Sequence, residues 1–142
     1  MALVNWCSDW DVGIAAIDAQ HREMADVLNR LEAAVAAGAA NESILAKLIQ
    51  LTELHFALEQ DLFRQANYPA GGVHTQRHGF LRLILKRVGE PLDNNRNPVA
   101  DRSHLEFLRG WLMNHIDRDD RAFADYLREK EATLPSVSAS CA

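Results

Sequence analysis

The stretch from His55 to His78 reads HFALEQDLFRQANYPAGGVHTQRH and predicts both a helical hairpin and a metal site. His55 and Glu59 are four residues apart before a turn at residues 67–72, and His74 and His78 are four apart after it. Residues at this spacing lie on one face of an α-helix. A short turn makes the two helices antiparallel neighbours, so that the two pairs can converge. Converging imidazole and carboxylate groups are typical metal ligands.

The composition is that of one ordinary globular domain. The chain has 142 residues, of which 48% are hydrophobic and 25% are charged. The net charge of −5 and the lack of a basic cluster argue against nucleic acid and anionic membranes as partners. The first residues show no basic segment followed by an apolar one, and no apolar run approaches the ~20 residues of a spanning helix. We therefore expect a soluble, cytoplasmic protein.

The two cysteines, Cys7 and Cys141, lie near opposite ends of the chain. In a cytoplasmic protein we expect both to be reduced, exposed thiols. A disulfide stays open as an alternative, because an even number of helices brings both termini to one end of a bundle. Neither cysteine is near the histidines in sequence, so we exclude both as metal ligands.

Apolar residues recur at helical spacing in four segments of the chain. The expected helices span residues 19–37, 42–65, 73–88 and 98–130, with Asp18, Asn41 and Asn97 as N-caps. Their connections are mostly short, which predicts an all-α fold, an up-down-up-down antiparallel four-helix bundle over residues 18–131.

The two ends of the chain lie outside this bundle. Residues 1–17 are expected to form an extended N-terminal arm, with Trp6 and Trp10 packed over the end of the bundle. Residues 132–142, rich in small and polar side chains, are expected to form a disordered tail.

Five of the six histidines fall on the apolar faces of the expected helices. Burying that many polar groups without partners would cost several kcal/mol each, which a bound metal would offset. With the two nearby carboxylates the candidate ligands are His21, His55, Glu59, His74, His78, His115 and Asp120. Seven ligands are too many for one zinc ion, so two metals bridged by two carboxylates fit better. A set rich in neutral histidines also favours the ferrous state, and hence reversible binding over oxygen activation.

Helical spacing does not place Asp120 or His104 in the site. Asp120 follows His115 by five residues, about 140° round an α-helix, so the α-helical period alone does not place it in the site. His104 precedes His115 by eleven residues, about 16 Å along the helix. We therefore interpret His104 as a structural or surface histidine.

Two competing metal motifs fit poorly. The segment His74-Thr75-Gln76-Arg77-His78 has Thr75 where the HExxH motif of metalloproteases needs glutamate. Ferritin-like di-iron oxidases use Glu-x-x-His pairs, and this chain has none.

Over roughly residues 6–127 the chain resembles the hemerythrins, in particular the single-domain bacteriohemerythrins. The resemblance rests on VGIAAIDAQH at 12–21, HFALE at 55–59, YPAGGVHTQRHGF at 68–80 and WLMNHIDRDD at 111–120. Four-helix bundles of this type are known for the family. Four positions depart from the family's common pattern. Gln60 stands where a second glutamate is frequent and Phe63 where methionine is frequent. Asp119 replaces a usually apolar residue, and Met24 stands where leucine is often found.

The resemblance implies a non-haem centre of two iron ions with an oxo or hydroxo bridge. His74, His78 and His115 would hold one iron. His21 and His55 would hold the other and leave a position open. Glu59 and Asp120 would bridge the pair, and dioxygen would be the partner. The implied oxygen pocket consists of Met24, Phe56, Trp111, Leu112 and Ile116.

We therefore expect reversible dioxygen binding, as a carrier or store, and not an enzyme, because no nucleophile, base or substrate cleft is visible. Three alternatives stay open: an oxygen or redox sensor, a di-iron enzyme acting on peroxide or nitric oxide, and a bundle that uses metal for stability alone. The sequence shows no apolar outer stripe, so a monomer is expected, and an unidentified protein partner stays open.

Overall fold

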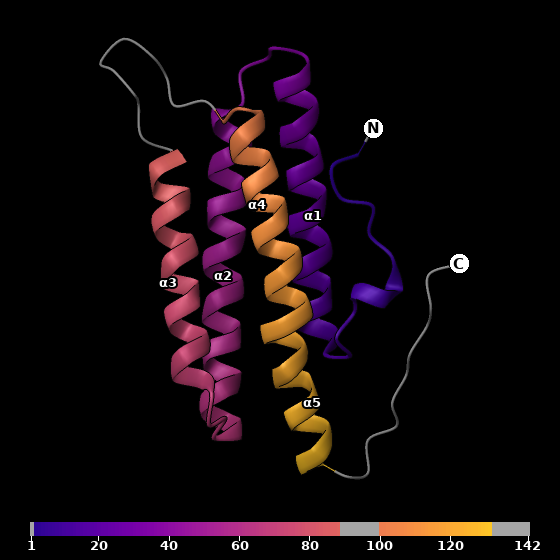
Figure 1. The fold of residues 1–142 in the computed structure, drawn as a ribbon, viewed down its shortest axis with the longest axis vertical. Helices are drawn as coiled ribbons and strands as arrows, with labels where there is room; N and C mark the ends of the chain where they lie inside the picture. The colour runs from indigo at the N-terminus through magenta and orange to yellow at the C-terminus, as the bar shows by residue number, and fades with distance from the viewer. Residues whose placement is uncertain (1, 89–99, 132–142) are drawn as a thin grey trace.

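In the computed structural model, which describes residues 2–88 and 100–131, the chain forms four antiparallel helical rods and an N-terminal arm (Figure 1). The first three rods are α1 (Ala15–Ala36), α2 (Glu42–Ala66) and α3 (Gly71–Val88). The fourth rod consists of α4 (Arg102–His115), a π-helical turn η2 (Ile116–Asp120) and α5 (Arg121–Lys130). The described residues contain no strand, and the predicted all-α four-helix bundle is confirmed.

Each rod buries one apolar face along the axis of the bundle. On α1 buried residues recur every three or four positions, as Ile17, His21, Met24, Leu28 and Leu31. Fully burying such an apolar side chain contributes about 1.5–3 kcal/mol. One half of the core is aliphatic and contains an apolar cavity of about 10 Å³. The other half holds the buried histidines and carboxylates.

The start of α1 differs from the prediction. The helix begins at Ala15, so Asp18 lies in its first turn and is not its N-cap. The Asp18 carboxylate instead accepts hydrogen bonds from the backbone N–H groups of Val12 (2.8 Å) and Gly13 (3.1 Å) in the arm. The same arm is held from α5, where Arg128 Nη1 donates to the Val12 carbonyl at 2.9 Å. Asp18 therefore fixes the arm to the bundle.

The arm carries Trp6 to the side of the bundle. Its ring centroid lies 6.2 Å from that of His21, so the expected position over the end of the bundle is wrong for Trp6. In Figure 1 the arm runs beside α1, with the short helix η1 (Ser8–Trp10) near its middle.

The N-caps of the second and fourth rods also differ in detail. Asn41 precedes α2 as predicted, but its side chain bonds the backbone of Ala100, with Ala100 N–H donating to Oδ1 at 3.1 Å. The fourth rod begins at Arg102, four residues later than expected, with Asp101 as its N-cap. The cap predicted at Asn97 lies outside the described residues, as does the tail predicted over 132–142.

The sixth histidine has the structural role expected of it. His104 and Asp101 form a reciprocal capping box at the start of α4. The backbone N–H of His104 donates to the Asp101 carboxylate at 3.0 Å, and the backbone N–H of Asp101 donates to His104 Nδ1 at 3.2 Å.

Cys7 is disulfide-bonded, which corrects the expectation of a reduced thiol at this position. Cys141 lies outside the described residues. None of the described helices has both the length and the apolar character needed to cross a membrane. Five large apolar side chains are nevertheless exposed, which the sequence pattern did not predict: Leu54, Val73, Phe80, Leu83 and Phe107.

Candidate metal centre

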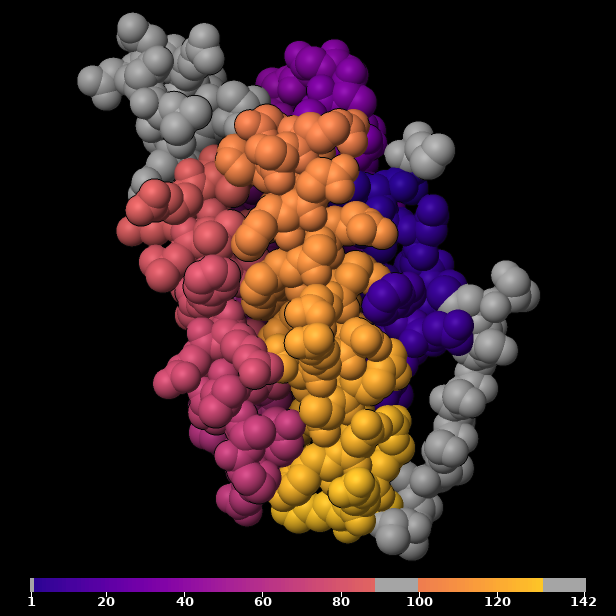
Figure 2. All heavy atoms as spheres, in the orientation of Figure 1, coloured from indigo at the N-terminus to yellow at the C-terminus, as the bar shows by residue number. Residues whose placement is uncertain are grey.

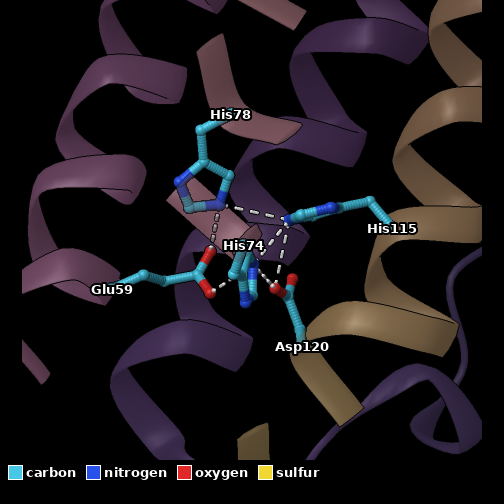
Figure 3. Close-up of side chains that lie close together, drawn as sticks. All are labelled: Glu59, His74, His78, His115 and Asp120. Atoms are coloured by element: carbon cyan, nitrogen blue, oxygen red, sulfur yellow. Dashed lines mark hydrogen bonds and ion pairs between the residues drawn. The ribbon is translucent and has the colours of Figure 1, made fainter. Parts of the chain in front are cut away.

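The structure brings all seven candidate ligands together in the middle of the bundle. They form two groups in which the potential ligand atoms lie within 4.8 Å of one another. One group has three histidines and the other has two, and both contain Glu59 and Asp120. All seven side chains are almost completely buried. The three-histidine group consists of Glu59, His74, His78, His115 and Asp120 (Figure 3), and the two-histidine group of His21, His55, Glu59 and Asp120.

All four rods contribute to this centre. His21 comes from α1, and the pair His55 and Glu59 comes from α2 with the predicted i,i+4 spacing. His74 and His78 come from α3, again four residues apart. The fourth rod supplies His115 at the end of α4 and Asp120 at the end of η2. The metal centre therefore depends on the assembly of the whole bundle.

The π-helical turn explains how Asp120 reaches the site. In an α-helix a residue five positions after His115 points about 140° away from it. Hydrogen bonds in a π-helix span five residues in place of four, so that the fifth residue returns to nearly the same face. The turn covers Ile116–Asp120, and Asp120 Oδ1 lies 3.2 Å from His115 Nε2.

Asp120 contacts both groups with different oxygens. Its Oδ2 lies 2.8 Å from His21 Nε2, in the two-histidine group. Its Oδ1 lies 2.9 Å from His74 Nε2, in the three-histidine group. The Glu59 carboxylate also faces both groups, because it contacts His55 and lies 3.5 Å from His78 Nε2. Both carboxylates therefore belong to both candidate groups at once.

The polar atoms of the centre lack the partners that burial requires. None of the four carboxylate oxygens of Glu59 and Asp120 receives a well-aligned hydrogen bond, although histidine nitrogens surround them. The Nε2 atoms of neighbouring histidines also face one another, at 3.2 Å for His21 and His55 and at 2.9 Å for His74 and His115. Buried carboxylate oxygens without hydrogen-bond donors are costly unless a cation neutralises them. This donor set of imidazoles and carboxylates fits a pair of transition-metal ions.

The pKa values of the metal-free centre show the same need for positive charge. Burial and the charge of Asp120 raise the pKa of Glu59 to about 7. Burial lowers the pKa of His55, but the charges and hydrogen bonds of Glu59 and Asp120 together outweigh it and raise the value to about 9. Contacts with Asp119 and Asp120 overcome burial at His115 in the same way and raise its pKa to about 9. At neutral pH these two histidines therefore carry protons beside the carboxylates.

His78 behaves in the opposite way. Burial, together with the charges of His74 and His115, lowers the pKa of His78 to about 2. His78 is therefore neutral across the physiological range and has the free lone pair that a metal ligand needs.

Two side chains outside the ligand set contact ligand histidines. Gln20 Oε1 lies 2.8 Å from Nδ1 of His55, and Asp119 Oδ2 lies 2.8 Å from Nδ1 of His115. The sequence identified Asp119 only as an unusual residue and did not identify Gln20. Gln20 and His55 lie on different helices, so no sequence spacing relates them.

Aromatic rings cover several of the ligand histidines. Phe56 stacks on His78 with ring centroids 3.9 Å apart, and Trp111 stacks on His115 at 4.5 Å. Phe63, which the sequence identified only as a departure, lies 4.6 Å from His74.

Of the five residues of the implied oxygen pocket, four are buried in the core and one, Trp111, reaches the surface. Met24 and Leu112 line the small apolar cavity of the core, and Phe56 and Ile116 are fully buried. Trp111 is only half-buried and lines a different pocket at the surface.

That surface pocket has a volume of about 370 Å³ and lies where α3, α4 and η2 meet. Figure 2 shows the face of the molecule on which α3 and the fourth rod lie. The lining residues are Arg77, Phe80, Trp111, Asn114, His115, Arg118 and Asp119. The pocket therefore brings solvent close to the outer edge of the His115 ring.

Comparisons with known proteins agree with this arrangement. A family model described as the hemerythrin HHE cation binding domain matches residues 12–127. A bacteriohemerythrin of Stenotrophomonas maltophilia is 34% identical over 131 residues, which are 90% of this chain and 84% of that protein. A hemerythrin-like protein of Naegleria gruberi is 29% identical over 87% of this chain and 92% of its own length. The crystal structure of a wild-type hemerythrin matches the fold with a TM-score of 0.74, at 24% identity, over 89% of this chain and 98% of that one.

Proposed function

Because the chain belongs to the hemerythrin family, we propose that its centre binds two iron ions and that the pair binds dioxygen reversibly. The observation that carries this proposal is the sharing of Glu59 and Asp120 between the two ligand groups. Two separate mononuclear sites would not need to share both of their carboxylates.

The histidines divide unequally in this proposal. His74, His78 and His115 would hold one iron, and His21 and His55 would hold the other. Glu59 and Asp120 would bridge the two ions. The iron with two histidines has one nitrogen ligand fewer, and so a position for an external ligand. When bound, the iron pair would supply that open position and the electrons that dioxygen binding requires.

The protein's own contribution is to exclude water from this position. The seven ligands are buried, and the ring of Phe56 covers His78. Met24, Leu112 and Ile116 provide an apolar wall within the core. Water and protons would otherwise promote loss of the bound gas in a reduced form and leave ferric iron. Together with Trp111, these residues form the proposed oxygen pocket.

We also propose that the protein is a carrier or store and not an enzyme, and that it is a cytoplasmic monomer. The acidic net charge of −5 supports a soluble partner-free state. A cytoplasmic location requires that Cys7 be reduced in the cell and that its disulfide form only on later oxidation. Trapping free thiols with an alkylating reagent at the moment of cell lysis tests the location, because a labelled Cys7 is expected in a cytoplasmic protein.

A visible absorption spectrum tests the function. The reduced protein, loaded with iron under nitrogen, is measured before air is added, after air is added, and after degassing. We expect two irons per chain and a ligand-to-metal charge-transfer band that appears with air and disappears on degassing. A one-way change to a ferric spectrum would instead favour a redox sensor or an enzyme acting on peroxide or nitric oxide. Stabilisation by metal with no response to air would leave only a structural role.

A further inference from the structure

The His115 ring has one nitrogen directed at the centre and one directed away from it. Its Nε2 lies 2.9 Å from His74 Nε2 and 3.2 Å from Asp120 Oδ1. Its Nδ1 lies 2.8 Å from Asp119 Oδ2. If Nε2 binds a metal as a neutral imidazole, Nδ1 carries the proton. That proton is then adjacent to a carboxylate.

Asp119 is itself held from the opposite helix. Its other oxygen, Oδ1, accepts a hydrogen bond from Arg77 Nη1 on α3. The Asp119 side chain is 13% exposed, so solvent screens it only in part. The contact with His115 is a short ion pair that does not have the geometry of a hydrogen bond. Arg77 and Asp119 thus link α3 and η2 just outside the three-histidine group.

The other four histidines lack such a carboxylate. Among the described residues, the carboxylate contacts of His21, His74 and His78 are all made through Nε2, and their Nδ1 atoms have no hydrogen-bond partner. His55 Nδ1 contacts the neutral amide oxygen of Gln20 at 2.8 Å. The two halves of the centre are therefore supported differently, with an anionic partner on one side and a neutral one on the other.

We propose that Asp119, held in place by Arg77, is a positioning residue that acts through His115 on the metal of the three-histidine group. A carboxylate at Nδ1 fixes the tautomer and orientation of the ring and makes Nε2 a stronger donor. A stronger donor stabilises the ferric ion more than the ferrous ion. The metal of the three-histidine group is consequently the one more easily oxidised. This inference rests on the proposed iron pair, but its effect on metal affinity does not depend on iron.

Zinc provides the first test, because its binding involves no oxidation. Asp119→Asn keeps the size of the side chain and removes its charge. We expect it to weaken zinc binding at the three-histidine group by roughly 10–100-fold. In zinc-loaded protein with ¹⁵N-labelled histidine, the His115 Nδ1–H resonance should move upfield and exchange faster with water. Arg77→Gln should produce smaller changes in the same direction.

The second test is a spectroelectrochemical titration of the iron-loaded protein. One of its two reduction steps should shift to a more positive potential in Asp119→Asn. A tenfold change in the preference for ferric over ferrous iron corresponds to about 59 mV. Asp119→Glu, which restores the charge, should recover part of the shift. A merely structural role would lower the unfolding temperature without selecting one reduction step.

Asp125→Asn is the matched control, because Asp125 also pairs with an arginine, Arg128, but is exposed and lies on α5. It should change neither the zinc affinity nor the potentials. Unchanged zinc affinity, Nδ1–H resonance and potentials in Asp119→Asn would overturn the inference. If the zinc results hold but no iron pair forms, the proposed function fails and the positioning role of Asp119 stands.

Discussion

The two shared carboxylates are the residues on which the centre depends most. Glu59 and Asp120 are completely buried, and no well-aligned hydrogen bond reaches their oxygens. Each faces both histidine groups. In the proposed two-iron centre, removing one of them would take a ligand from both metals at once, whereas removing a histidine would take a ligand from one metal only.

Substitutions of ligands should therefore have unequal effects on metal content. Glu59→Ala should lose both irons, because it removes a ligand from each. His55→Ala should lose mainly the iron of the two-histidine group and retain about one iron per chain. Iron is measured by mass spectrometry after anaerobic loading and desalting.

The control for this pair is Asp61→Ala, which removes an exposed carboxylate from the same helix. It should retain the metal content of the unsubstituted protein. If Glu59→Ala keeps two irons per chain, Glu59 does not bridge.

Sequence spacing predicted the ligands better than it predicted their partners. His55 with Glu59 and His74 with His78 follow the i,i+4 rule within single helices, which a sequence displays directly. The contacts of Gln20 with His55 and of Arg77 with Asp119 join different rods. Such contacts depend on the rotation and packing of two helices, which no local pattern contains.

At the scale of the elements, the π-helical turn is the feature that the sequence could not show. The segment IDRDD at Ile116–Asp120 has no glycine or proline to mark an irregular turn. The α-helical period would direct Asp120 away from His115. The π-helical turn contains one residue more than an α-helical turn, which brings Asp120 back to the face of His115. Phe123 and Ala124 of α5 remain buried in the core. The resemblance to a family identified Asp120 where periodicity did not.

Of the helix caps, the sequence predicted Asn41 correctly and Asp18 wrongly. Asn41 was predicted at the right position because asparagine before an apolar periodic segment is a common helix start. Asp18 was predicted as a cap on the same grounds, but the helix begins earlier, at Ala15. Its carboxylate satisfies the N–H groups of an arm whose path the sequence pattern does not specify.

The end of the arm next to α1 should be held in large part by the Asp18 carboxylate. Asp18→Ala removes the acceptor for Val12 and Gly13, and leaves two N–H groups without a protein partner. We expect a loss of about 1–3 kcal/mol in the free energy of unfolding, measured in urea. Hydrogen exchange should accelerate at Val12 and Gly13, because their N–H groups lose the acceptor on α1, whereas the hydrogen bonds between Val4 and Asn29 are retained.

Asp26→Ala, an exposed position on the same helix, serves as the control and should leave both measurements unchanged. If Asp18→Ala has the stability of the unsubstituted protein and an equally protected arm, then other contacts hold the arm and Asp18 does not.

At the scale of the whole molecule, the centre connects all four rods through buried charge. A metal that binds the folded chain and not the unfolded chain stabilises the fold by mass action. Without metal, protons on His55 and His115 partly take its place beside the carboxylates. Metal and protons therefore compete for the same nitrogens, and metal stabilisation must depend on pH.

The direction of this dependence follows from the pKa values. His55 and His115 titrate near 9 in the metal-free fold and near 6.5 when unfolded. Their protons stabilise the metal-free fold fully below about pH 6.5 and lose this effect as the pH rises through about 9. Metal binding must displace both protons below pH 9. The apparent metal affinity should therefore increase by up to about a hundredfold per pH unit for two displaced protons.

Thermal unfolding of the metal-free and the zinc-loaded protein measures this effect. The difference between their unfolding temperatures should be smallest near pH 6.5 and should widen towards pH 9, because the metal-free fold loses stability while metal binding strengthens. His104→Gln provides a control, since His104 lies outside the centre and its replacement should leave the slope unchanged. A difference that stays constant between pH 6.5 and pH 9 would mean that His55 and His115 carry no protons for the metal to displace, and that the buried carboxylates are neutralised in some other way.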